Sequence, residues 1–246
     1  MFAALALSLA LSLAPSVTPP PAGGDVDYQL GGAVAPAARV DIVVRDRSAR
    51  PAAGRYNVCY VNAFQTQPDE ASFWRRHWSL VLKRGGAPVV DAAWGEWLLD
   101  LRTSTKRTAI SRIVGTWIDG CARSGYDAVE FDNLDSWSRS HGLVTRTQAK
   151  ALARALVRRA HARGLAAGQK NWAELDGTTL GFDFAVAEEC GRYDECGDYV
   201  ASYGRRVLVI EYRRADFDRA CARWGARLGI VLRDRAVSPR GVRAWC

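Results

Sequence analysis

The sequence predicts a single-domain α/β protein built as a (β/α)8 barrel. Three observations indicate this fold: the chain has 246 residues, it contains eight short apolar runs, and amphipathic segments lie between them. Single-domain barrels commonly have about this length. Continuous apolar runs are typical of strands that are buried on both faces of a parallel sheet. An open, doubly wound sheet is the alternative, although no glycine-rich nucleotide-binding loop follows the early strands.

The first 24 residues are expected to lie outside the barrel. Met1–Ala14 is an apolar run too short to cross a bilayer, and several prolines and the Gly23-Gly24 pair follow it. This pattern is typical of a secretory signal peptide and a flexible linker, although no Lys or Arg precedes the apolar run. We therefore expect residues 25–246 to form the barrel of an extracellular protein, without stable membrane insertion once the signal is removed.

Eight apolar runs are the expected strands of the barrel. They cover residues 27–30, 39–44, 56–61, 126–131, 165–169, 182–187, 207–211 and 228–232. The segment Ala87–Asp100 does not fit this eightfold count. It is predicted to be an elaborated loop over the carboxyl end of the third strand, where barrels place binding elements.

The helices between the later strands can be predicted from the spacing of apolar residues and from the residues that cap their ends. Apolar residues recur at helical spacing over residues 110–121. Thr145 with Gln148 has the pattern of a capping box, which begins a helix. Glycines follow three of the helical segments, and each is expected to adopt the left-handed conformation that ends a helix. They are Gly125, Gly164 and Gly225.

The six cysteines indicate disulfides rather than a metal site. Their number is even and no CxxC pair occurs, which fits disulfides in an oxidising compartment. Cys190 and Cys196 are close enough in sequence to close a small loop. The remaining pairings are open, with Cys59–Cys121 and Cys221–Cys246 as candidates, and free buried thiols are the alternative.

The formal net charge of +8 does not by itself indicate a nucleic-acid partner. Most of the positive charge is arginine spread along the helical segments, and no dense basic block with interleaved aromatic residues occurs. The three histidines are dispersed and lack the spacing of metal ligands. We expect a monomer with a basic, solvated surface and with neither a metal nor a cofactor.

Two strands that end in acids are the most informative feature for function. The fourth strand ends at Asp132 and the sixth ends at Glu188. The carboxyl ends of parallel strands share one rim of a barrel, which is where barrel enzymes place their catalytic groups. A pair of carboxylates without a cofactor motif matches glycoside hydrolysis, in which one acid protonates the leaving oxygen and the other attacks or activates water.

Further polar and aromatic side chains are expected around this rim and are predicted to bind substrate. They are Asn62, Gln65, Trp94, Glu96, Glu130, Asn133, Lys170, Asn171, Glu189, Glu211 and Tyr212. A structural role is the alternative for each of them; Glu211, for example, could simply neutralise Lys170.

The facing of Glu130, Glu188 and Glu189 bears on the role that each can have. Glu130 shares the facing of Asp132 one layer deeper, where it could hold the environment of Asp132 or raise a partner's pKa as a like charge. Strand alternation sends only one of Glu188 and Glu189 inward. A weak internal repeat, in which Gly-aromatic-Asp precedes both Asp132 and Glu188 at the same spacing, favours Glu188.

Six ordered motifs resemble glycoside hydrolase family 114, the endo-α-1,4-polygalactosaminidase group of (β/α)8 barrels. They are Tyr56–Pro68, Trp94–Arg102, Tyr126–Asp135, Gly168–Asn171, Phe182–Cys190 and Ile210–Tyr212. The resemblance covers nearly all of the chain after Asp27. It implies endo-acting cleavage of an α-1,4-linked, galactosamine-rich polysaccharide, with retention of configuration expected. Asp132 matches the family's candidate nucleophile and Glu188 its candidate acid/base.

Two other functions remain open at this point. The same barrel could be a catalytically silent carbohydrate-binding protein, or it could hydrolyse another α-linked glycan. A cationic polyamine substrate should prefer an acidic cleft, whereas this chain is basic overall. The acids of the rim would therefore have to make the cleft locally negative.

Overall fold

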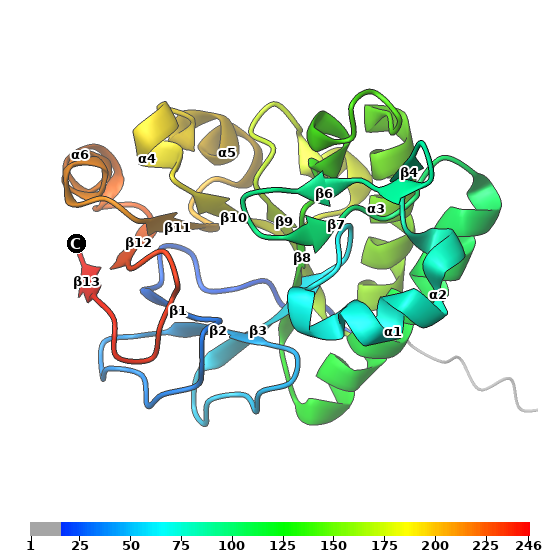
Figure 1. The fold of residues 1–246 in the computed structure, drawn as a ribbon. Coiled ribbons are helices and arrows are strands. Elements are labelled where there is room, and N and C mark those ends of the chain that lie inside the picture. Colours follow the sequence, from blue (N-terminus) through cyan, green and yellow to red (C-terminus); the bar gives the residue numbers. More distant parts are fainter. Residues whose placement is uncertain (1–15) are drawn as a thin grey trace, which may run out of the picture.

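The computed structural model describes residues 16–246, which form a nearly closed barrel (Figure 1). Eight consecutive parallel strands make up the barrel, and a ninth strand, β13 (Arg243–Trp245), pairs antiparallel with the last of them. The eight strands are β1 (Val26–Gln29), β2 (Ile42–Asp46), β3 (Tyr56–Asn62), β8 (Ala128–Asp132), β9 (Ala166–Lys170), β10 (Phe184–Glu188), β11 (Val207–Glu211) and β12 (Gly229–Arg233). The predicted barrel class is therefore confirmed, and all eight expected strands are present.

Side chains close the seam between the first and the last parallel strand. β1 and β12 lie side by side without a ladder of backbone hydrogen bonds. Arg233 and Arg243 instead each donate to the buried Asp27, both at 3.3 Å. The indole of Trp245 on β13 donates to the carbonyl of Val26 at 2.8 Å. The buried Asp27 is thus neutralised by two guanidinium groups, which a buried carboxylate requires.

Helices cover only part of the barrel (Figure 1). Their bounds are α1 (Ala71–Arg76), α2 (Ser104–Ser124), α3 (Arg146–His161), α4 (Cys190–Tyr193), α5 (Cys196–Tyr203) and α6 (Arg214–Trp224). The connections from β1 to β2 and from β2 to β3 are loops, in contrast to the expected alternation of strand and helix. Pro36 and Pro51 lie within these short connections. Proline interrupts a helix, and neither connection is long enough for a helix to begin after its proline.

Short 3-10 helices complete the regular structure. They are η1 (Pro68–Glu70), η2 (Trp78–Leu80), η3 (Ser136–Arg139) and η4 (Gly177–Leu180). The η4 turn is the only helical element between β9 and β10 in the described chain. No helix among residues 16–246 is long and apolar enough to cross a membrane.

The helix ends agree with the sequence except at one glycine. The capping box of Thr145 and Gln148 is present at the start of α3. Gly125 and Gly164 have φ values of 86° and 76°, as a left-handed helix end requires. The same expectation is wrong for Gly225, whose φ is −59°. The chain continues there in a right-handed turn, because the next residues still bond back to the carbonyl of Trp224.

The second part of the expected linker is ordered against the barrel. Pro20 and Gly24 are buried. The backbone N–H of Gly23 donates to the carbonyl of Arg205 at 2.8 Å, and the Tyr56 hydroxyl donates to the carbonyl of Thr18 at 2.7 Å. The expectation of a flexible linker is therefore wrong for residues 16–24. The expected signal peptide lies outside the described residues.

The connection after β3 is elaborated, as predicted. It contains two small hairpins, formed by β4 (Lys83–Arg84) with β5 (Ala87–Pro88) and by β6 (Val90–Asp91) with β7 (Glu96–Trp97). The second hairpin carries Trp94 at its tip and Glu96 on β7. Figure 1 shows both hairpins beyond the carboxyl ends of the barrel strands.

All six cysteines form disulfides. Cys59 of β3 joins Cys121 of α2, Cys190 joins Cys196, and Cys221 of α6 joins the terminal Cys246. The three pairs are the ones that the sequence offered as candidates. The first disulfide fastens a helix to the barrel wall, and the second lies directly beyond the end of β10.

The disulfides should contribute unequally to stability. The first spans 62 residues and the second spans only 6. A chain-entropy estimate gives a loss of about 4 kcal/mol in the free energy of unfolding for Cys59→Ala/Cys121→Ala and about 2 kcal/mol for Cys190→Ala/Cys196→Ala. Urea denaturation of the two double variants measures both values. A larger loss in the second variant would contradict the loop-entropy explanation.

Candidate active site

The side chains that face inward at the carboxyl ends of the strands form one polar cluster. Phe184 and Val186 point into the barrel, so alternation also sends Glu188 inward at the end of β10. The same alternation on β8 places both Glu130 and Asp132 inside, and on β9 it places Lys170 inside. Figure 1 shows that β8, β9 and β10 are neighbours, so these side chains converge.

Lys170 is the centre of this cluster. Its ammonium nitrogen lies 3.3 Å from oxygens of Glu130 and Asp132 and 3.4 Å from an oxygen of Glu188. The side chain is only 2% exposed. Burial alone would lower the pKa of Lys170, but the carboxylates of Asp132, Glu188 and Glu130 together raise the pKa well above its usual value. Lys170 is therefore a permanent cation that holds three acids together.

Glu130 forms the floor of the cluster. The Tyr28 hydroxyl donates to its Oε1 at 2.6 Å and lies 2.8 Å from Lys170 Nζ. The other oxygen, Oε2, is buried and has no hydrogen-bond partner. Burial raises the pKa of Glu130 to about 7, although the nearby Lys170 opposes this rise. Glu130 thus lies one layer below Asp132, as expected from strand alternation.

Both oxygens of Asp132 are held in place. Oδ2 accepts a hydrogen bond from the Tyr60 hydroxyl at 2.7 Å, and Oδ1 accepts one from the backbone N–H of Asn133 at 2.8 Å. Lys170 contacts the same Oδ1. A carboxylate with these partners has little freedom to rotate, and it lies at the bottom of an open cleft.

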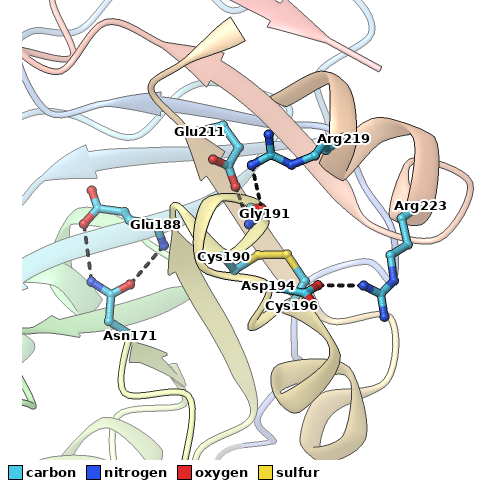
Figure 2. Close-up of a disulfide and its surroundings, with 9 residues drawn as sticks. All are labelled: Asn171, Glu188, Cys190, Gly191, Asp194, Cys196, Glu211, Arg219 and Arg223. Atoms are coloured by element: carbon cyan, nitrogen blue, oxygen red, sulfur yellow. Dashed lines mark hydrogen bonds and ion pairs between the residues drawn. A yellow bond between two sulfur atoms is a disulfide. The ribbon is translucent and has the colours of Figure 1, made fainter. Parts of the chain in front are cut away.

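Glu188 is held by two residues of the rim. The Tyr212 hydroxyl donates to Oε1, and the Asn171 amide lies 3.4 Å from Oε2. Asn171 also accepts from the backbone N–H of Glu188 at 2.9 Å, so it fixes both the main chain and the side chain (Figure 2). Three residues expected around the rim, Lys170, Asn171 and Tyr212, therefore lie beside Glu188.

Glu96 and three amides form a second polar layer beside Asp132. Asn62 donates to Glu96 Oε1 at 2.9 Å, and Asn133 donates to Oε2 at 3.2 Å. The amide of Gln65, oriented with its nitrogen toward Glu96, donates to Oε2 at 3.0 Å. Burial raises the pKa of Glu96 to about 7, whereas the amide hydrogen bonds lower it. The second hairpin is thereby joined to β3 and β8 next to the Asp132 carboxylate.

Glu189 does not join the cluster around Lys170. Its φ of 58° turns the chain at the start of α4, and its carboxylate pairs with Arg192 at 2.6 Å. A second arginine, Arg235, lies 4.0 Å away. Of the two adjacent glutamates, Glu188 is therefore the one that faces Lys170.

The placement expected for Glu211 is wrong. On β11, Leu208 and Ile210 face the barrel interior, so Glu211 faces outward toward the helices. Its Oε1 accepts from the backbone N–H of Gly191 at 2.6 Å, beside the Cys190–Cys196 disulfide (Figure 2). Glu211 lines neither chamber of the cleft. It supports the segment that follows Glu188 from behind and cannot contact a bound sugar.

The cleft above the cluster consists of two connected chambers of about 420 Å³ each. The first chamber lies over Asp132, and the second lies beyond Glu188. Residues of the first chamber alone include Tyr60, Asp91, Glu96, Asp132, Arg139 and Lys170. Residues of the second chamber alone include Trp137, Trp172, Glu174, Tyr193, Glu195 and Tyr199. Both chambers share Trp94, Asp135, Asn171, Glu188, Tyr212 and Arg235.

Several residues of the cleft were not predicted from the sequence. Arg139 contacts Asp91 and Asp135, both at 2.9 Å, and Arg235 lies 5.3 Å from the ring of Trp94. Arg139 ends the short 3-10 helix η3 and Arg235 lies in a turn after β12, and such short segments carry no periodic signal. Tyr28 could have been found, because it alternates inward on the first expected strand.

No group of three His, Cys, Asp or Glu side chains in residues 16–246 is arranged to hold a metal ion. A larger groove of about 760 Å³ lies between α2 and α3 and contains none of the predicted site residues. Most of the predicted groups line the cleft at the carboxyl rim. Asn62, Gln65 and Glu130 are buried against these groups and line neither chamber, and Glu211 faces away from the barrel interior.

Comparison with known proteins identifies the family. The family model of glycoside hydrolase family GH114 matches residues 7–246. The chain belongs to this family. As a GH114 member it is a glycosidase. No curated protein sequence matches the chain.

Solved structures are similar to this GH114 barrel in fold. Ega3 from Aspergillus fumigatus, in complex with galactosamine, is 21% identical with a TM-score of 0.72, and 97% of this chain and 99% of that chain are covered. The glycoside hydrolase domain of PelA from Pseudomonas aeruginosa is 18% identical with a TM-score of 0.61, over 89% and 97% of the two chains. The fold of these proteins is the barrel described above.

The buried Glu211 should make stability depend on pH. Burial raises the pKa of Glu211 from 4.5 to about 7, although the Gly191 N–H opposes the rise. Because the folded protein holds the Glu211 proton more tightly than the unfolded chain does, the protonated Glu211 stabilises the fold. This stabilisation is complete below pH 4.5 and is lost as the pH rises through about 7. Glu211→Gln, which stays neutral, should therefore be more stable than the wild type by about 1–3 kcal/mol at pH 8 and nearly equal to it at pH 4.5.

Urea denaturation of both proteins at the two pH values measures this difference. Glu96 and Glu130 titrate in both proteins, so only the difference between variant and wild type reports on Glu211. A difference that is the same at both pH values would show that Glu211 does not carry the effect.

Proposed function

We propose that this GH114 protein is an extracellular, endo-acting and retaining glycosidase that cleaves α-1,4-linked, galactosamine-rich polysaccharide. The observation that carries the proposal is the shared contact of Asp132 and Glu188 with Lys170 at the bottom of the cleft. Two carboxylates flanking one site are what glycoside hydrolysis requires. The alternatives are a silent carbohydrate-binding barrel and hydrolysis of another α-linked glycan.

The spacing of the two carboxylates supports retention. Their nearest oxygens lie 3.3 and 3.4 Å from the same Lys170 nitrogen, so they cannot be further apart than the sum of these distances. That limit barely reaches the roughly 6.5 Å at which inverting enzymes begin, whereas retaining enzymes place their carboxyl groups about 5 Å apart. For these two oxygens the limit includes the retaining distance and excludes most of the inverting range.

In the first step, an oxygen of Asp132 bonds to the anomeric carbon while the bond from that carbon to the leaving oxygen breaks. Protonated Glu188 gives its proton to the leaving oxygen at the same time. In the second step, the Glu188 carboxylate takes a proton from water, whose oxygen displaces Asp132 from the anomeric carbon. Tyr60 and Lys170 stabilise the Asp132 carboxylate whenever it is free, and Tyr212 orients Glu188.

The charges of the cleft support an amino-sugar substrate. Arg139 is paired with Asp91 and Asp135, and Lys170 is shared among three acids, so these cations are neutralised locally. The cleft therefore offers a surplus of carboxylates within a basic chain, and such a surplus attracts a cationic sugar. Ega3, which has the same fold, was solved with galactosamine.

The disulfides and the apolar run at the start of the sequence support export of the protein from the cell. Three disulfides join all six cysteines, and disulfides persist in oxidising compartments. The apolar run at the start of the chain has the composition of a signal peptide. An enzyme that cuts a polymer too large to enter a cell would also have to act outside it.

Replacement of the two acids separates an enzyme from a silent binding protein. Asp132→Asn and Glu188→Gln should each lower kcat/KM on partially deacetylated α-1,4-galactosamine polymer by about 10²–10⁴-fold. Polymer binding should persist in both variants, because the cleft keeps its shape. Asp218→Asn, whose carboxylate is exposed on α6, is the matched control and should leave kcat/KM unchanged.

NMR of the first products tests the stereochemistry. Retention predicts that the α-anomer of the new reducing end appears before mutarotation. Initial release of the β-anomer would contradict the nucleophilic role of Asp132. Absence of oligosaccharide release by the wild type from every amino-sugar polymer would contradict the enzymatic proposal as a whole.

A further inference from the structure

The two chambers of the cleft differ in which of the proposed catalytic acids line them. Asp132 lines only the first chamber, whereas Glu188 lines both chambers. Trp94 and Arg235 also line both chambers, with the Arg235 guanidinium 5.3 Å from the centre of the Trp94 ring. The boundary between the two chambers therefore includes the residue assigned as acid/base, and the assigned nucleophile lines only one side of it.

This division gives the bound polymer a direction, provided that the proposed retaining mechanism holds. The sugar that bonds to Asp132 must lie in the first chamber, and the leaving oxygen must lie at Glu188. We propose that the second chamber binds the leaving portion of the chain, toward its reducing end, and that Tyr199 and Glu195 select an amino-sugar unit there. The first chamber then holds the sugar that forms the covalent intermediate.

Tyr199 is the main evidence that the second chamber is built for a ligand. Its side chain extends from α5 and is only 3% exposed, yet it lines the chamber. Among residues 16–246 its hydroxyl has no hydrogen-bond partner, whereas the Tyr203 hydroxyl on the same helix donates to Gln169 at 2.6 Å. The hydroxyl oxygen is not enclosed by protein, so a sugar hydroxyl or amine in the chamber could pair with it in place of water.

The acids of the second chamber define the charge of this ligand. Neither Glu174 nor Glu195 has an ion-pair partner among residues 16–246, in contrast to Glu189, which pairs with Arg192. Burial and the neighbouring carboxylate of Glu174 raise the pKa of Glu195. A protonated sugar amine would relieve this repulsion, whereas an N-acetyl group would leave the two acids uncompensated.

Aromatic residues give the second chamber surfaces for sugar rings. Trp137 and Trp172 pack with their ring centroids 5.4 Å apart in one wall. Tyr193 is 57% exposed at the rim, which is unusual for a large aromatic side chain. The first chamber is lined by Tyr60, Trp94 and Tyr212 but by no such pair of packed rings, and its acids are bound by Lys170, Arg139 and amides.

Comparison of two substrates tests the assignment. An aryl α-galactosaminide fills the first chamber and has only a small leaving group, whereas a reducing-end-labelled α-1,4-galactosamine oligomer fills both chambers. Tyr199→Phe and Glu195→Gln should lower the ratio of kcat/KM for the oligomer to kcat/KM for the aryl glycoside by about fivefold or more, because each loses a contact made only to the leaving portion. Tyr193→Ala, at an exposed position that tolerates substitution, should lower the same ratio.

Two controls keep the result interpretable. Tyr126→Phe removes a hydroxyl that bonds backbone carbonyls far from the cleft, and it should leave the ratio unchanged. The position of cleavage relative to the label should also shift in the second-chamber variants. An unchanged ratio and an unchanged cleavage position in all three variants would overturn the inference, while inactivity of the wild type on both substrates would overturn the proposed function instead.

Discussion

The arrangement of the site depends on the ammonium group of Lys170. Three carboxylates lie within 3.4 Å of it at the bottom of the barrel mouth, and two of them are the proposed catalytic acids. Without this cation their mutual repulsion and burial would be uncompensated, and breaking a buried ion pair typically costs about 3–5 kcal/mol. With it, Asp132 and Glu188 are held close enough for retaining chemistry, and Glu130 below them anchors Lys170 through Tyr28.

The rest of the barrel keeps this charge arrangement rigid. The hairpin after β3 brings Glu96 against Asn133, whose backbone N–H holds Asp132. Behind Glu188, the disulfide between Cys190 and Cys196 constrains the turn, and Glu211 binds its backbone from the helical side (Figure 2). The acids are thus fixed from the loops and from the outer layer, so the cleft itself can stay open to a polymer.

Strand positions and the inward acids could be predicted because parallel strands and two-residue alternation leave a direct trace in sequence. The shared facing of Glu130 and Asp132 was readable, because they are two residues apart on one strand. The facing of Glu211 was not readable, because all the other residues of its strand are apolar and the strand is buried on both faces. Arg139 and Arg235 lie outside the barrel strands, where no periodicity predicts direction, and the two-chamber shape of the cleft depends on such residues.

The central claim is that Asp132 becomes covalently bonded to sugar while Glu188 handles the proton. Mass spectrometry of the Glu188→Gln variant tests it most directly, using an α-galactosaminyl substrate whose leaving group needs no protonation. The first step then proceeds and the second is slow, so one galactosaminyl unit should accumulate on the peptide that contains Asp132. A sugar adduct on any other residue, or turnover to an inverted product without an adduct, would contradict the account.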